Sequence, residues 1–160
     1  MSTDGLITCL WFDDQAEEAA EYYVSVFKDG RLGPIGRHTE AGPGPAGSVL
    51  TVYFEINGQR FVALNGGAQP WTFNESVSFQ IPCRDQAEVD YYWDALTDGG
   101  QEAECGWLKD RYGLSWQVVP EQLLKWVGDP DQESAARTMR AMFAMKKFDI
   151  AALQRAHAGA

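Results

Sequence analysis

Neutral polar and aromatic side chains are the residues of this sequence whose types and spacing best suit chemistry. Ser78 and Gln80 alternate with apolar residues, so in a strand their side chains share one face of a sheet. Gln117 lies in a second alternating stretch, shortly after Trp107. Hydroxyl, amide and indole groups form hydrogen bonds without a full charge, which is typical of sites for small polar or aromatic ligands.

The usual catalytic side chains form weaker patterns. Cys105 could act as a nucleophile if Lys109 or Arg111 lowered its pKa, but no histidine or carboxylate base stands near it in sequence. A packed structural thiol is therefore the favoured interpretation. The histidines, His38 and His157, fall in a loop-side strand and in the C-terminal tail, where we expect solvated polar residues.

The first half of the chain predicts the elements of one module. An apolar run, an amphipathic stripe and a glycine- and proline-rich stretch come before two further strands. Asp13 and Asp14 are the expected caps of the helix, and Asn57-Gly58 is a type I′ hairpin signal. In order, the predicted elements are a strand over residues 6–12, a helix over 16–27, an irregular strand and loop over 31–47, and strands over 49–56 and 59–64.

The same order of elements then starts again. The predicted elements are a strand over residues 76–82, a helix opening at Asp85, and a hairpin of strands over 106–110 and 114–119. The run Asp-Gln-Ala-Glu occurs at 14–17 and again at 85–88, each time followed by a pair of tyrosines. This repetition favours a duplication and an α+β fold of two tandem βαβββ modules. Within one domain of residues 1–160, we expect modules over 4–68 and 74–120 and a helical C-terminal extension over 121–160.

Composition and charge narrow the classes of partner. Thirteen Lys and Arg against 23 Asp and Glu give a net charge of −10, which argues against nucleic acid and anionic membrane as partners. Three cysteines without a C-x-x-C pair fit reduced thiols. The first residues show no signal-peptide pattern and no stretch approaches the length of a membrane helix, so we expect a cytoplasmic protein.

Several segments resemble a known family. They are residues 7–12, 54–59, 63–67, 73–79, 105–110 and 112–117. They are similar to the PhnB-like branch, often labelled demethylubiquinone methyltransferase-like, of the vicinal oxygen chelate superfamily, which includes glyoxalase I and dioxygenases that cleave catechols. The resemblance implies the paired βαβββ fold, with a ligand on the concave faces of the sheets.

The methyltransferase label of this family can be tested against the glycine-rich segments of the sequence. A doubly wound methyltransferase needs a glycine-rich turn between a strand and a helix. The only candidate, residues 30–36, follows a helix and contains a proline. We therefore interpret that segment as a loop leading into an edge strand and reject the label.

The resemblance also implies positions for a chelated divalent metal. A metal ion of this kind needs several carboxylate or imidazole ligands, and of the implied positions only Gln117 could serve, weakly. We therefore expect no metal and no cofactor. The implied positions are Ser76 and Gln117 in the second module, and Ile7 or Thr8 with Phe61 or Ala63 in the first.

Alternation, taken with the resemblance, predicts a ligand-binding concavity. Its predicted lining is Cys9, Trp11, Asn65, Ser78, Gln80, Trp107 and Gln117. A polar network that binds nothing is an equal alternative. Three functions stay open: a metal-independent small-molecule-binding protein of the glyoxalase/bleomycin-resistance type, a lyase or dioxygenase-like enzyme, and a dimeric partner-binding protein without ligand.

The tail after Pro120 predicts a homodimer. Its apolar content is large for an appendage and would otherwise leave an exposed patch. The alternative is that the tail folds back over its own sheet. The residues concerned are Leu123, Leu124, Trp126, Met139, Met142, Phe143 and Phe148.

Overall fold

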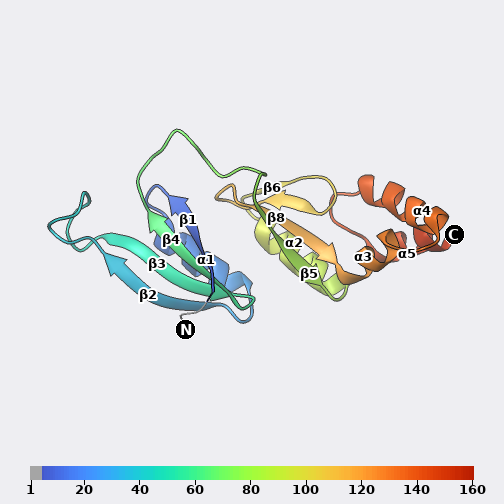
Figure 1. The fold of residues 1–160 in the computed structure, drawn as a ribbon, viewed down its shortest axis with the longest axis horizontal. Coiled ribbons are helices and arrows are strands. Elements are labelled where there is room, and N and C mark those ends of the chain that lie inside the picture. The colour runs from blue at the N-terminus through green and yellow to red at the C-terminus, as the bar shows by residue number, and fades with distance from the viewer. Residues whose placement is uncertain (1–4) are drawn as a thin grey trace. The chain divides into compact units, whose positions relative to one another are not determined.

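Two four-stranded sheets, each with one helix packed on it, form the framework of the chain (Figure 1). A computed structural model describes residues 5–160, so the expected module start at residue 4 lies outside the described residues. The chain divides into two compact units, which we call unit 1, ending at Trp71, and unit 2, beginning at Thr72. Each unit is described by itself below.

Unit 1 is a βαβββ module. Its elements are β1 (Ile7–Phe12), α1 (Ala16–Val26), β2 (Arg31–Arg37), β3 (Val49–Ile56) and β4 (Gln59–Asn65). The strand order is β1-β4-β3-β2, with β1 parallel to β4. Asn57 and Gly58 both have positive φ, 48° and 69°, so the predicted type I′ hairpin is confirmed. Stacked rings of Tyr23, Phe54 and Phe61 fill the core between α1 and the sheet.

Unit 2 repeats this arrangement and adds three helices. Its elements are β5 (Ser78–Cys83), α2 (Gln86–Thr97), β6 (Gln101–Glu102), β7 (Trp107–Lys109), β8 (Ser115–Pro120), α3 (Glu121–Val127), α4 (Gln132–Phe143) and α5 (Ile150–Ala158). The strand order β5-β8-β7-β6 has the same connectivity as in unit 1, with β5 parallel to β8. The predicted α+β fold of two βαβββ modules with a helical extension is therefore confirmed.

The identical residues at the two helix starts do not occupy equivalent positions, because the structural offset between the helices differs by one residue from the offset between the identical residues. Each buried residue of α2 lies 70 positions after a buried residue of α1. The Asp-Gln-Ala-Glu runs are 71 positions apart and the tyrosine pairs 69, so neither identity joins equivalent positions. The equivalent buried pairs are Ala19 and Val89, Tyr23 and Trp93, and Val26 and Leu96.

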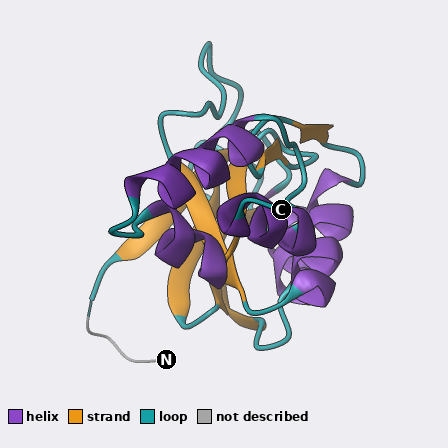
Figure 2. Cartoon of the chain, turned by 90° about the vertical axis from the view of Figure 1, so that its right-hand side faces the viewer, coloured by secondary structure: helices purple, strands orange, loops and turns teal. Residues whose placement is uncertain are grey.

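The C-terminal extension folds against its own unit. Cys105 N and Gly106 N donate to the carbonyl oxygens of Met145 and Lys146, both at 2.8 Å. Helices α3, α4 and α5 lie together at the C-terminal end of unit 2, which faces the viewer in Figure 2. The small core under them contains Val119, Leu123, Phe148 and Leu153. Of the apolar tail residues, Leu124, Met139 and Phe143 are exposed.

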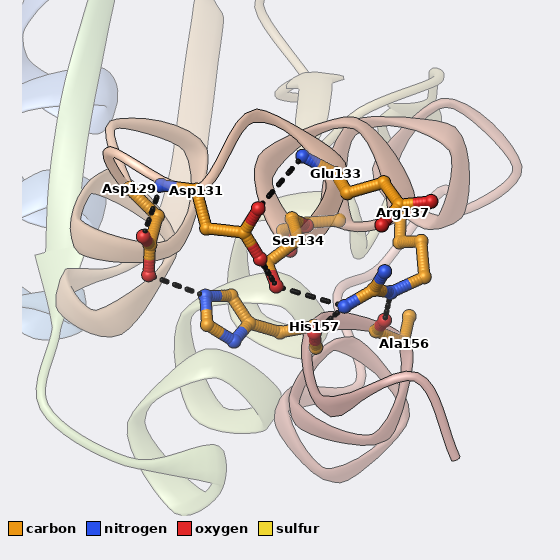
Figure 3. Close-up of polar contacts among 8 residues, drawn as sticks. Asp129, Asp131, Glu133, Ser134, Arg137, Ala156 and His157 are labelled. Carbon is orange, nitrogen blue, oxygen red and sulfur yellow. Dashed lines mark hydrogen bonds and ion pairs between the residues drawn. The ribbon is translucent and has the colours of Figure 1, made fainter.

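Polar contacts tie α4 to α5 (Figure 3). Arg137 donates to the carbonyl oxygens of Ala156 and His157 at 3.1 and 2.8 Å, at the negative end of the α5 dipole. His157 Nε2 lies 3.0 Å from an Asp129 carboxylate oxygen, and its ring lies beside Trp126. The expectation that His157 is solvated is therefore wrong: it is a half-buried structural partner.

Candidate functional site

Four of the predicted pocket residues lie together on one face of the unit 2 sheet. In the strand register, Gln80 and Trp107 are both partners of Gln117, and Ser78 is a partner of Ser115. The opposite face carries the buried residues Ile81, Trp116 and Val118. We call the surface formed by Ser78, Gln80, Trp107 and Gln117 the unit 2 face.

The side chains at the centre of the unit 2 face are uncharged, and a hydrogen bond between two of them fixes an orientation. Gln117 Nε2 donates to Ser78 Oγ at 2.8 Å, which orients the amide. Ser115, next to Ser78 in register, is fully buried, and its Oγ has no hydrogen-bond partner among the described residues. Lys109 lies on the same face and its Nζ pairs with Glu75 at 2.6 Å. The sequence analysis did not place Lys109 or Glu75 at this face, although alternation along β7 puts Lys109 on the same side as Trp107.

Cys9 and Trp11 belong to unit 1, where they share the sheet face of their register partners Val62 and Leu64. Trp11 Nε1 donates to the carbonyl oxygen of Gly67 at 2.9 Å. The Trp11 ring stands edge-on to Trp71, with centroids 6.0 Å apart. Both indoles are more than one-third exposed, so they form an aromatic surface on unit 1.

Asn65 does not share the sheet face of Cys9 and Trp11, contrary to the prediction, and it lines a different cavity of unit 1, beside the loop over residues 43–48. Its side chain accepts from Ala16 N at 2.8 Å and donates to the carbonyl oxygen of Val49 at 3.1 Å. Asn65 thereby caps α1. Asp13 and Asp14 were expected in this role, but no side chain at the start of the helix itself caps it. The expected inward direction of Ala63 is wrong too, since Ala63 is fully buried in the core. Phe61 lies on the same side of β4 as Ala63 and Asn65. Its large apolar side chain was the sequence signal that this side faces the core.

We predict that Asn65→Ala destabilises unit 1 without affecting ligand binding. The substitution leaves the first N–H of α1 without its acceptor, and losing a cap costs about 1–2 kcal/mol. Urea denaturation measures this cost. Gln132→Ala, at an exposed position of α4, is the control and should change the unfolding free energy by less than about 0.5 kcal/mol. A ligand that binds wild type but not Asn65→Ala would contradict the assignment.

Within each unit, the implied metal positions do not bring strong ligands together. Ser76 precedes β5 and its hydroxyl bonds to Asn74, so the residue beside Gln117 is Ser78. In unit 1, Phe61 and Ala63 face the core. Among residues 5–160, no group of three or more His, Cys, Asp or Glu is placed to hold a metal ion.

The donors on the unit 2 face do not fit a divalent cation. Gln117 turns its amide nitrogen toward Ser78, and a hydroxyl and an amide are weak ligands compared with carboxylate or imidazole. Lys109 on the same face is paired with Glu75, so these two charges offset one another. The arrangement instead offers hydrogen bonds and an indole surface to a ligand of low charge.

The thiols are not activated. Burial raises the pKa of Cys83 to about 12, with the carboxylates of Glu88, Asp85 and Glu121 adding to the effect. Burial, aided by the charge of Glu104, also raises the pKa of Cys105. Lys109 and Arg111 are engaged with Glu75 and Asp98, so neither lowers it. Cys105 is a packed thiol whose Sγ lies 3.7 Å from the Met142 carbonyl oxygen.

The fold and the arrangement of strands define a protein of the vicinal oxygen chelate type. The chain belongs to the family described as 3-demethylubiquinone-9 3-methyltransferase, whose model matches residues 4–119. This is the PhnB-like family that the sequence segments resemble.

Solved structures agree with this assignment. The PhnB protein from Bacillus cereus is 31% identical, with a TM-score of 0.66 over 73% of this chain and 99% of its own. Protein PA1353 from Pseudomonas aeruginosa is 21% identical, with a TM-score of 0.60 over 74% of this chain and 98% of its own. The fosfomycin resistance protein FosX from Mesorhizobium loti shares the fold at 12% identity, with a TM-score of 0.50 over 74% and 91%. No curated protein matches the chain. In residues 5–160, no helix has the length and apolarity needed to span a membrane.

Proposed function

We propose that this chain is a metal-independent small-molecule-binding protein of the glyoxalase/bleomycin-resistance type, with its ligand on the unit 2 face. The observation that carries the proposal is the oriented pair of Gln117 and Ser78 beside Trp107. An amide held in one orientation presents its remaining polar atoms in a fixed direction, and an indole beside it supplies apolar contact. The ligand class that fits is a small polar or aromatic molecule of low charge.

Binding is better supported than catalysis on this face. Neither an amide nor a serine hydroxyl acts as a general base near neutral pH. Lys109 is held in an ion pair with Glu75. The methyltransferase activity in the family's description also lacks support, because residues 30–36, the glycine-rich segment, lie mostly on β2 rather than on a turn between a strand and a helix.

A screen of small aromatic and polar metabolites by thermal shift, followed by calorimetry, tests the proposal. A ligand found in this way should bind Trp107→Ala and Gln117→Leu at least about tenfold more weakly, because each variant loses a main contact. Gln132→Leu, a matched change at an exposed position of α4, should bind as wild type does. Binding that both unit 2 variants retain in full would reject this face as the site.

We predict that Gln117→Glu does not create a tight metal site. The new carboxylate would have the Ser78 hydroxyl, a weak ligand, as its nearest polar neighbour, and the Glu75 carboxylate is already paired with Lys109. Titration of the variant with zinc and manganese should show no binding at micromolar concentrations. Stoichiometric metal in purified wild-type protein, measured by mass spectrometry, would overturn the metal-independent part of the proposal.

We also propose that the chain forms a homodimer through exposed apolar residues of the extension. Leu124, Met139 and Phe143 are 66%, 39% and 63% exposed, and Met139 and Phe143 are four residues apart on one side of α4. A stable symmetric interface buries at least ~1,000 Å² in total. Light scattering at micromolar concentration tests this: twice the chain mass supports it, and 17.8 kDa at every concentration rejects it.

A further inference from the structure

The unit 2 face is accessible in the middle of β8 and closed on either side of it. Alternation along β8 places Ser115, Gln117 and Val119 on the side of the sheet that carries this face. Ser115 is fully buried, and Val119 is 7% exposed in the core under the C-terminal extension. Gln117 between them is half-buried, and its register partners are the exposed Gln80 and the half-buried Trp107. A small ligand on this face therefore meets one row of side chains across three strands.

Gln117 and Trp107 each present one polar atom that the protein leaves unused. Gln117 Nε2 donates to Ser78 Oγ, so the amide oxygen Oε1 is the atom left to accept. Among residues 5–160, no donor bonds to Gln117 Oε1 and no acceptor to the indole N–H of Trp107, and neither atom is buried. Directly opposite residues of neighbouring strands have Cβ atoms about 5 Å apart, so one ligand can reach both. The row thus offers an acceptor beside a donor.

These two atoms select among the polar groups that a ligand can carry. A carbonyl group alone accepts from Trp107 but leaves Gln117 Oε1 without a donor, and burying an unpaired acceptor costs free energy. A carboxylate has acceptors only, and the cation on this face, Lys109, is already paired with Glu75 at 2.6 Å. An ammonium has donors only and would leave the Trp107 N–H unpaired. An amide whose N–H and C=O lie on the same edge supplies one partner to each atom.

We propose that the unit 2 face binds a neutral molecule carrying such an amide, either a primary amide or a lactam. Its N–H donates to Gln117 Oε1, and its carbonyl oxygen accepts from Trp107 Nε1. The exposed amide of Gln80, on the other side of Gln117, can donate or accept, so it adds contact without selecting the group. This inference rests on the proposed function of the same face and narrows its ligand from any small molecule of low charge to one chemical class.

Nuclear magnetic resonance of the full-length chain tests this inference with compounds of nearly equal size. Benzamide should shift the Trp107 indole N–H resonance saturably. Acetophenone, which has a methyl group in place of the amide nitrogen, and benzoate, which has no donor, should each bind at least about fivefold more weakly. Isoindolinone, a lactam, separates the two sources of the group. If it binds as well as benzamide, the ligand class includes lactams, and if it binds less well, primary amides are preferred.

The outcomes separate this inference from the proposed function. Equal binding of benzamide and acetophenone at Trp107 would overturn the inference and leave the proposed function intact, because the face would still bind aromatic molecules of low charge. No shift of the Trp107 indole N–H resonance with either benzamide or isoindolinone would also overturn the inference. The metabolite screen with Trp107→Ala and Gln117→Leu then decides the proposed function by itself.

Variants show whether the two named atoms read the amide. Gln117→Met removes the acceptor, so it should abolish the preference for benzamide over acetophenone while acetophenone binding stays nearly constant. Trp107→Phe keeps a ring and removes the N–H, so both compounds should bind several-fold more weakly, as followed at the Gln117 side-chain amide resonances. Gln132→Met makes the first change at an exposed position of α4 and should keep the wild-type preference. A wild-type preference in Gln117→Met would reject the assigned contact.

Discussion

Asp110→Ala should lower the free energy of unfolding by about 3–5 kcal/mol, because it leaves buried donors without an acceptor. Asp110 is 3% exposed and lies between β7 and β8. Its Oδ1 accepts from the backbone N–H groups of Tyr112 and Leu114 at 2.9 and 3.1 Å, and its Oδ2 accepts from Trp116 Nε1 at 2.8 Å. One carboxylate therefore holds both the turn and a core indole.

Urea denaturation, followed by tryptophan fluorescence and circular dichroism, measures this effect. The matched control is Asp98→Ala, whose side chain is 78% exposed and pairs with Arg111, and which should cost less than about 1 kcal/mol. Asp110→Asn is expected to lie between the two, because its amide nitrogen cannot accept from an N–H. Equal stability of Asp110→Ala and Asp98→Ala would show that the turn does not depend on this carboxylate.

The second large effect is expected from Phe148→Ala, which should cost about 3–5 kcal/mol. Phe148 is 2% exposed in the small core that joins the extension to the module, together with Val119, Leu123 and Leu153. Removing its ring leaves a cavity under α3 and α5. The extension should then become accessible to protease while the βαβββ module stays folded.

Phe143→Ala is the matched control, because Phe143 is 63% exposed on α4. Measured at the same low protein concentration, it should change stability by less than about 0.5 kcal/mol. Limited proteolysis followed by mass spectrometry identifies where cleavage begins. If Phe148→Ala is cut no faster than Phe143→Ala, the extension is held by contacts other than this core.

The first two helices, the hairpins and every strand except β6 could be predicted from the sequence because the forces that specify them are local. The Asn57-Gly58 pair favours positive φ whatever surrounds it, and Asp85 caps α2 through an N–H three residues away. Alternation likewise placed Ser78, Gln80 and Gln117 on one sheet face correctly. The repeated order of these elements was enough to predict the fold.

Tertiary structure decided which of these side chains have a functional neighbour. Asn65 caps α1 because Phe61 and Ala63, on the same side of β4, pack against that helix. If the opposite side of β4 packed on the helix, every side chain of the strand would change between the core and the other face of the sheet. The partner of Gln117 depends on the register between β5 and β8, which are joined by hydrogen bonds between segments far apart in sequence. The docking of the extension on its module likewise requires the packing of distant apolar side chains, such as Phe148 with Val119, which no local pattern encodes.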